Sequence, residues 1–112
     1  MRYFHNPRCQ KSREGLQLLQ EKGLQPEVVL YMTDPLSPMD LEDILAKLDI
    51  DAEDLIRSKE SVWKEEFKGK ELSEDELVLA MIEYPQLMER PILVNGERAV
   101  IGRPAEKLLE IL

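Results

Sequence analysis

The feature that most constrains the fold is the alternation of strand and helix patterns near the start of the chain. Residues 2–5 form a short β-prone run that ends at the turn-forming pair Asn6-Pro7. Residues 9–22 have helical periodicity, with Gly23 as the expected C-terminal stop. Residues 27–31 contain three consecutive apolar side chains, which is typical of a buried strand. This order predicts a βαβ unit with parallel strands and a right-handed crossover.

The middle of the chain has helical patterns. Ser37 and Ser73 each begin an N-capping pattern, and apolar residues follow both at helical spacing. The intervening segment, residues 51–70, predicts short helices and loop. A helical region is therefore expected between the two groups of strands.

A β-hairpin and a closing helix are predicted for the last part of the chain. Residues 91–94 and 98–101 flank Asn95-Gly96, the strongest short turn signal. The complete order is β-α-β, a helical insert, and β-β-α. It predicts an α/β fold with a thioredoxin-like core and a mixed four-stranded sheet. We expect a single domain over residues 1–112, with the inserted helical region at about 36–89.

The composition is that of a globular protein of the cytoplasm. Apolar residues make up 43% of the 112 residues and charged residues 34%. No apolar run reaches the roughly 20 residues needed to cross a membrane, and the N-terminus lacks a secretory h-region. The single cysteine cannot form an internal disulfide, which favours a reducing compartment. We therefore expect a cytoplasmic protein without a membrane partner.

The net charge of −8 is unevenly distributed. Residues 24–89 carry 6 basic and 18 acidic side chains, whereas residues 1–23 carry 5 and 2, and residues 90–107 carry 4 and 2. No basic stripe covers the domain, so a nucleic-acid partner is not expected. The basic ends favour a small anion bound where they meet, the alternative being that these charges only solvate the surface.

Cys9 lies where the first strand gives way to a helix. Free backbone N–H groups and the helix dipole favour a negative charge there, so we expect a thiol pKa below the usual value of about 8.5. Arg8, Lys11 and Arg13 add positive charge nearby, and apolar burial is not expected among such neighbours. The alternative is a small buried structural cysteine. The position predicts a reactive thiolate.

Two polar residues flank this cysteine in the sequence. His5 is the only histidine, and its ring could reach the same loop or be structural. Ser12 could donate a hydrogen bond from the first turn, and it stands where thioredoxins carry a resolving cysteine. Because the C-x-x-C motif is absent, a second thiol has to come from a small molecule such as glutathione or from a partner protein.

Four motifs occur in register along the chain: H-N-P-R-C-Q-K-S-R at 5–13, L-I-R at 55–57, E-R-P-I at 89–92 and G-R-P at 102–104. Together they resemble the glutaredoxin-coupled arsenate reductase (ArsC-like) family of thioredoxin fold. The best-known members follow the cysteine with Gly-Thr-Ser-Arg, whereas this chain has Gln10-Lys11-Ser12-Arg13, so it resembles a variant N-P-R-C-Q-K-S-R branch. Gln10 could either crowd an anion pocket or add a donor to it.

The resemblance implies a role for each matching residue. Cys9 matches the active cysteine, His5 a histidine that tunes it, and Pro91 the cis proline beside it. The arginines that hold the oxyanion match Arg57, Arg90 and Arg103. Guanidinium forks suit a tetrahedral anion such as arsenate.

The resulting hypothesis is a reductase of arsenate or a similar oxyanion, with glutathione as external reductant and glutaredoxin as partner. One alternative is a monothiol reductase of glutathione mixed disulfides, and another is a non-catalytic regulator that binds RNA polymerase. No bound cofactor is expected. One histidine and one cysteine do not make a usual metal site.

Overall fold

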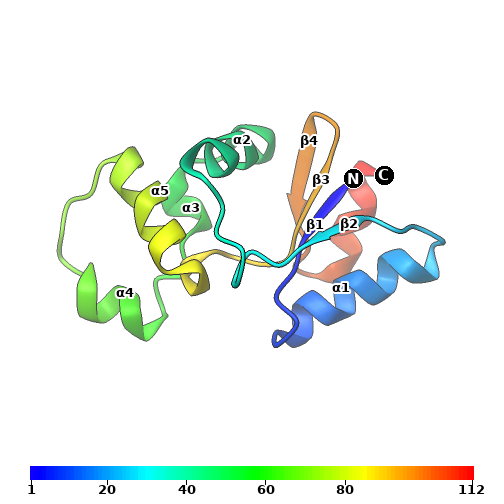
Figure 1. The fold of residues 1–112 in the computed structure, drawn as a ribbon, viewed down its shortest axis with the longest axis horizontal. Helices are drawn as coiled ribbons and strands as arrows, with labels where there is room; N and C mark the ends of the chain where they lie inside the picture. The colour runs from blue at the N-terminus through cyan, green and yellow to red at the C-terminus, as the bar shows by residue number, and fades with distance from the viewer. The chain divides into compact units, whose positions relative to one another are not determined.

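The computed structural model has one mixed β-sheet, built from strands near the two ends of the chain. Its strands are β1 (Arg2–Phe4), β2 (Glu27–Val29), β3 (Ile92–Asn95) and β4 (Arg98–Ile101). They lie in the order β2-β1-β3-β4 (Figure 1). β1 pairs parallel with β2 and antiparallel with β3, and β3 pairs antiparallel with β4. The predicted βαβ unit, hairpin and mixed four-stranded sheet are confirmed.

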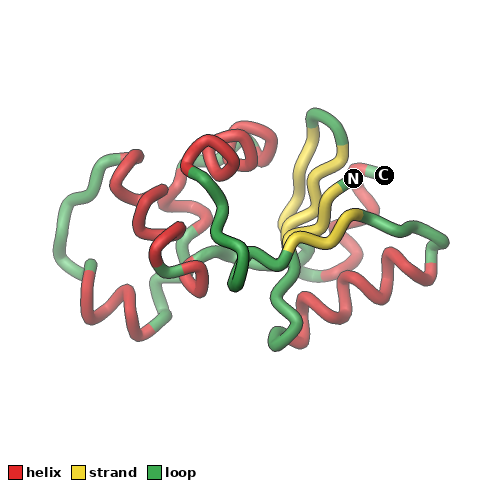
Figure 2. Tube along the Cα trace, in the orientation of Figure 1, coloured by secondary structure: helices red, strands yellow, loops and turns green.

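The structure describes residues 1–112, which form two compact units. The first, here called the sheet unit, comprises Met1–Asp34 and Arg90–Leu112. The second, the helical unit, comprises Pro35–Glu89. All four strands belong to the sheet unit, and the helical unit consists of helices and loops with one isolated bridge between Ile56 and Met88 (Figure 2).

Two helices pack together in the sheet unit: α1 (Gln10–Glu21) and the 3₁₀ helix η2 (Ala105–Ile111). Gly23 follows α1 at φ +79°, a conformation that favours glycine, and its N–H caps the Gln20 carbonyl. The predicted closing helix exists, but it is a 3₁₀ helix of 7 residues. A buried core joins these helices to the strands; its members are Tyr3, Leu19, Leu93, Leu108 and Ile111.

Strand β2 differs from its prediction as a buried strand. Its burial pattern runs from exposed Glu27 and Val28 to half-buried Val29, and Val28 is 42% exposed. The reason is its place at the edge of the sheet, where it pairs only with β1. An apolar run indicates a strand but does not distinguish an edge strand from a central one.

The hairpin turn is shifted by one residue from the Asn95-Gly96 pair that predicts it. Asn95 is the last residue of β3 and pairs with Arg98, so the two-residue loop is Gly96-Glu97. Gly96 has φ +64° at the first central position, where a type II′ turn requires glycine. The Asn95 side chain instead donates to the Ile111 carbonyl at 2.7 Å, which ties the hairpin to η2.

The helical unit contains α2 (Pro38–Leu48), α3 (Ala52–Leu55), α4 (Ser61–Glu66), α5 (Glu74–Glu83) and the 3₁₀ helix η1 (Pro85–Leu87). Helices α2 and α3 and η1 each contact α5, while Phe67 meets Tyr84 edge-on at 5.8 Å. The short α3 and α4 confirm the helices predicted over residues 51–70. None of the helices in the structure has the length and apolar character required to cross a bilayer.

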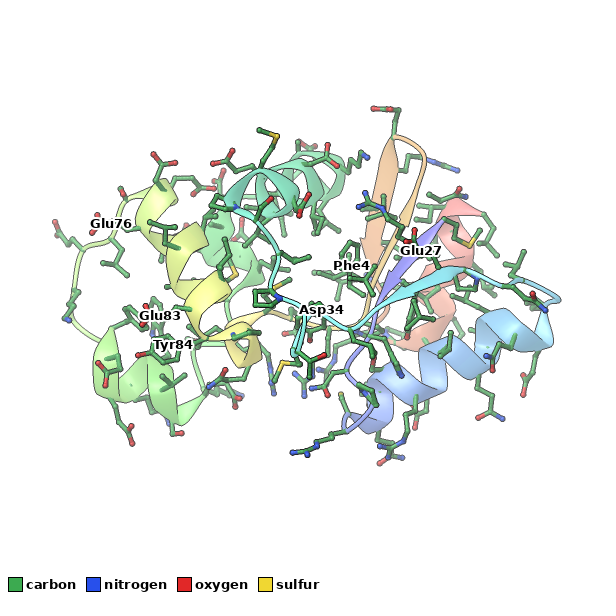
Figure 3. The ribbon with its side chains drawn as sticks, in the orientation of Figure 1. Phe4, Glu27, Asp34, Glu76, Glu83 and Tyr84 are labelled. Atoms are coloured by element: carbon green, nitrogen blue, oxygen red, sulfur yellow. The ribbon has the colours of Figure 1, made fainter.

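The two predicted N-caps are confirmed in this unit. Ser37 accepts a hydrogen bond from the Asp40 N–H at the start of α2, and the Asp40 carboxylate accepts one from the Ser37 N–H. Ser73 and Glu76 form the same reciprocal pair at the start of α5. Figure 3 labels Glu76 of this pair. Such caps satisfy backbone N–H groups that the first turn leaves free.

Candidate active site

Cys9 is the N-cap residue of α1. Its backbone is extended, with φ −97° and ψ 122°, its N–H donates to the Asn6 carbonyl at 3.0 Å, and its own carbonyl accepts from Arg13 at 3.0 Å. Cys9 is buried, with only 9% of the residue exposed. Its position as the N-cap places it beside the free N–H groups of the first turn, so its surroundings are not purely apolar.

A guanidinium group reaches Cys9 from the other end of the sequence. The Arg90 Nε lies 3.1 Å from the Cys9 Sγ. Pairing of β1 with β3 aligns Phe4 with Ile92 and so brings residue 90 to the strand end from which the Cys9 turn begins. The Arg90–Pro91 peptide bond is cis. The sheet topology thus joins two parts of the chain that are 81 residues apart.

The pKa of the Cys9 thiol is lowered from its ordinary value. Burial raises it, but hydrogen bonds from the Ser12 backbone N–H and the Arg90 guanidinium, the charge of Arg90 and the Lys11 N–H together outweigh this effect. A helix N-terminus and a facing cation stabilise the thiolate over the thiol.

The basic and polar neighbours in the sequence are directed elsewhere. Arg13 Nη1 donates to the Pro7 carbonyl at 2.9 Å and so holds the loop that precedes the helix. Lys11 Nζ lies 3.7 Å from Glu14, and the Gln10 amide donates to the same carboxylate at 3.0 Å. Gln10 therefore lies along the exposed surface of α1 in contact with Glu14. The guanidinium that contacts the thiol belongs to Arg90, which is remote in sequence.

Ser12 and His5 form a buried pair beneath this turn. The Ser12 hydroxyl lies 2.7 Å from His5 Nδ1 and accepts from the Asn6 N–H at 3.0 Å. With its oxygen accepting from Asn6, the hydroxyl can donate to Nδ1, an arrangement that leaves the ring proton on Nε2. Burial and the charge of Arg13 lower the His5 pKa. Ser12 also acts on the thiol, because its backbone N–H in the first turn lowers the pKa of Cys9.

Arg103 follows the residue that is hydrogen-bonded to Pro91. The Gly102 N–H donates to the Pro91 carbonyl at 2.9 Å, and Arg103 follows Gly102 directly. The Arg103–Pro104 bond is also cis. Arg103 is exposed at this edge of the sheet unit.

Arg57 belongs to the helical unit. Its Nη1 lies 3.4 Å from the Gln86 carbonyl and 3.5 Å from the Glu60 carboxylate, and its Nε lies 3.9 Å from Glu89. These contacts hold the guanidinium near the short bridge between residues 56 and 88.

One residue of the site is missing from the sequence prediction. The Tyr3 hydroxyl donates to the Ser12 carbonyl at 2.6 Å, a buried contact between β1 and the first turn of α1. The sequence signals for this contact are a tyrosine in the first strand and a glycine, Gly15, in the helix that follows. The structure contains no cluster of three or more His, Cys, Asp or Glu side chains that could hold a metal ion.

The β-α-β unit, the antiparallel hairpin and the cysteine at the first strand-to-helix turn define the class: a thioredoxin-like protein with a single thiol. The ArsC family model matches residues 4–111. The chain belongs to the ArsC family.

Similar proteins cover this chain almost completely. It is 48% identical to the uncharacterized protein YfgD of Escherichia coli K12, over all of this chain and 96% of that protein. It is 45% identical to an arsenate reductase of Haemophilus influenzae, over 97% of this chain and 96% of that one. The solved structure of an arsenate reductase from Vibrio cholerae superposes with a TM-score of 0.95 at 41% identity, over 100% and 98% of the two chains.

Proposed function

We propose that this protein is a thiol-dependent reductase of arsenate or a similar tetrahedral oxyanion, with the Cys9 thiolate as nucleophile. The observation that carries the proposal is the 3.1 Å contact between Arg90 Nε and Cys9 Sγ at the N-terminus of α1. A cation beside the sulfur favours the thiolate, and a planar guanidinium also binds oxyanions through paired N–H donors. Relatives named arsenate reductase, at 40% and 45% identity over nearly the whole chain, support this substrate.

In the first step, the thiolate attacks arsenic and a sulfur–arsenic bond forms. One arsenate oxygen leaves as water after it takes up a proton, and arsenic remains in the +5 state. The N–H groups at the start of α1 and the Arg90 guanidinium stabilise the negative oxygens during this exchange. Arg90 therefore both orients the anion and keeps the nucleophile ionised.

In the second step, an external thiol completes the reduction. A glutathione thiolate attacks the Cys9 sulfur, the sulfur–arsenic bond breaks, and its electron pair stays on arsenic, which leaves as arsenite in the +3 state. The two sulfurs become a mixed disulfide, which glutaredoxin reduces. The chain has one cysteine, so this outside thiol is required. A cytoplasmic location, where glutathione keeps thiols reduced, fits this chemistry.

The remaining candidate residues take roles around these steps. The family resemblance assigns oxyanion binding to Arg90 and Arg103 of the sheet unit and, on the resemblance alone, to Arg57 of the helical unit; it assigns Pro91 a place beside the cysteine. His5 acts through Ser12 to tune the thiol. These roles rest on the family resemblance together with the Gly102–Pro91 and His5–Ser12 contacts.

A coupled assay tests the proposal. Purified protein is mixed with arsenate, glutathione, glutaredoxin, glutathione reductase and NADPH, and both NADPH oxidation and released arsenite are measured. The wild type should turn over, and Cys9→Ser should not. If the wild type releases no more arsenite than the glutathione blank, the arsenate assignment is wrong.

The same preparation separates oxyanion reduction from reduction of mixed disulfides. Arg103→Gln and Arg57→Gln are compared on arsenate and on a glutathionylated peptide. An oxyanion site predicts a loss on arsenate with the peptide reaction retained. Equal activity of both variants and the wild type on arsenate would contradict the roles assigned to these arginines.

A further inference from the structure

The start of helix α1 is fixed to the centre of the sheet through the side chain of Tyr3. This residue is fully buried in the core of the sheet unit, and β1, which carries it, lies between β2 and β3. Its hydroxyl donates to the Ser12 carbonyl at 2.6 Å. Its ring lies 5.6 Å from that of His5. A phenylalanine would fill almost the same volume, so Tyr3→Phe removes the hydrogen bond to the Ser12 carbonyl and little else.

Ser12 is held from three directions at once. Asn6 and His5 contact its hydroxyl at 3.0 and 2.7 Å, and Tyr3 contacts its carbonyl. The residue is completely buried. Its own N–H is one of the free donors at the helix N-terminus, three residues after the N-cap Cys9. These contacts therefore fix the first turn of α1, whose free N–H groups belong to the helix N-terminus that Cys9 caps.

Gly15 provides the space for this contact. A Cβ at position 15 would overlap the Tyr3 hydroxyl, and it would lie 3.0 Å from a Leu108 methyl and 3.3 Å from the Pro91 ring. A glycine in a helix interior is destabilising by roughly 0.5–1 kcal/mol relative to alanine. Its presence in α1 is explained by the close approach of the Tyr3 hydroxyl and the Pro91 ring.

We propose that Tyr3 is a positioning residue for the Cys9 thiolate: its hydroxyl, admitted by Gly15, holds Ser12 and with it the first turn of α1, at whose N-terminus the sulfur lies. Burial raises the pKa of Tyr3 above its usual range, so the hydroxyl remains a donor wherever the thiol is ionised. The relevance of this contact to turnover rests on the proposed function, but its effect on the thiolate does not.

The test is the rate of Cys9 alkylation by iodoacetamide as a function of pH, measured without any substrate. Tyr3→Phe should shift the rate profile to higher pH and lower the alkylation rate by at most about fivefold at a pH below the thiol pKa, because a less firmly held first turn loses part of the stabilisation that a helix N-terminus gives to a negative charge. Ile111→Val is the matched control, since it loosens the same core without touching the hydroxyl. It should leave the alkylation profile unchanged.

A second variant displaces the Tyr3 hydroxyl by adding a Cβ at position 15. Gly15→Ala should shift the alkylation profile in the same direction as Tyr3→Phe. In the Tyr3→Phe background, Gly15→Ala should add little to that shift, because the overlapping oxygen is already absent. Thermal unfolding of the wild type and the four variants identifies any variant that fails to fold.

Two outcomes would overturn the proposal. One is a Tyr3→Phe profile that coincides with the wild type, and the other is an equal shift in Ile111→Val. Both are independent of arsenate. A wild type that fails to reduce arsenate while Tyr3→Phe shows the expected shift would refute the proposed function and support the positioning role.

Discussion

Replacement of Arg90 by glutamine tests the electrostatic basis of the site directly. Glutamine keeps a planar amide donor but removes the positive charge next to the sulfur. Arg90 Nε lies 3.1 Å from Cys9 Sγ, and the guanidinium charge is one of the causes that lower the thiol pKa. Removal of that charge disfavours the thiolate, so the pKa of Cys9 should rise.

The size of the effect follows from the distance. A unit charge about 4 Å from the thiolate, allowing for the spread of charge over the guanidinium, is worth about 4 kcal/mol at an effective dielectric constant of about 20 and about 1 kcal/mol in bulk water. Glutamine retains part of the interaction, so a loss of about 1.4 kcal/mol is reasonable, which is a tenfold change in the thiolate equilibrium. At a pH below both pKa values, the variant should be alkylated about ten times more slowly.

Iodoacetamide alkylation over a range of pH measures this change. At a pH above both pKa values the two proteins should react at similar rates, because both thiols are then fully ionised. Arg98→Gln is the matched control, since Arg98 is exposed and lies at the turn end of the same hairpin. If Arg90→Gln followed the wild-type profile at every pH, the guanidinium would not be the counter-charge of this thiol.

Three further changes give independent checks. Arg13→Gln should raise the pKa of His5 in an NMR titration, because it removes a positive charge that lowers it; an unchanged titration would contradict that coupling. Folding lowers the His5 pKa from 6.5, so the unfolded chain binds the proton more readily than the folded protein as the pH falls. The His5 contribution to the free energy of unfolding should therefore decrease below pH 6.5, and this decrease should be smaller in Arg13→Gln. Ser37→Ala should destabilise the protein by about 1 kcal/mol in urea unfolding, and no change would argue against the cap. Gly102→Ala should destabilise by about 1–3 kcal/mol, because a Cβ there would lie 2.7 Å from a Leu108 methyl; a variant as stable as the wild type would show that Leu108 moves aside freely.

The elements set by local chemistry could be predicted from the sequence. Ser37 with Asp40, and Ser73 with Glu76, satisfy the N–H groups of their own first turns, and nothing distant is required. Gly23 ends α1 for a similarly local reason. The strand order was also accessible, because a short βαβ unit and a two-residue hairpin each fix one pairing.

The contacts that define the site depend on the tertiary structure. Two of the charges that lie near Cys9 in the sequence, Lys11 and Arg13, contact Glu14 and the Pro7 carbonyl instead. Glu14 is the i,i+3 neighbour of Lys11 on the helix, and the Pro7 carbonyl in the adjacent loop accepts from Arg13. Which partner a basic side chain contacts depends on the direction in which it points, and this cannot be read from the sequence.

The exposure of β2 and the contacts of the Ser12 hydroxyl could not be predicted, and they have a common cause. Val28 is exposed because β2 is an edge strand, and this depends on where the hairpin joins the sheet. The Ser12 hydroxyl contacts His5 and Asn6 because the loop between β1 and α1 folds over it. Periodicity indicates which residues share an element, but not which neighbouring element covers them.

The contact between Cys9 and Arg90 also has a consequence for synthesis of the protein. The thiol leaves the ribosome early, whereas its counter-charge and the strand that carries it into place come from the last quarter of the chain. A nascent chain that has folded only its first strand and helix therefore has helix N–H groups near the sulfur but no guanidinium. The thiol therefore gains this counter-charge only after the last quarter of the chain has been synthesised and β3 has paired with β1.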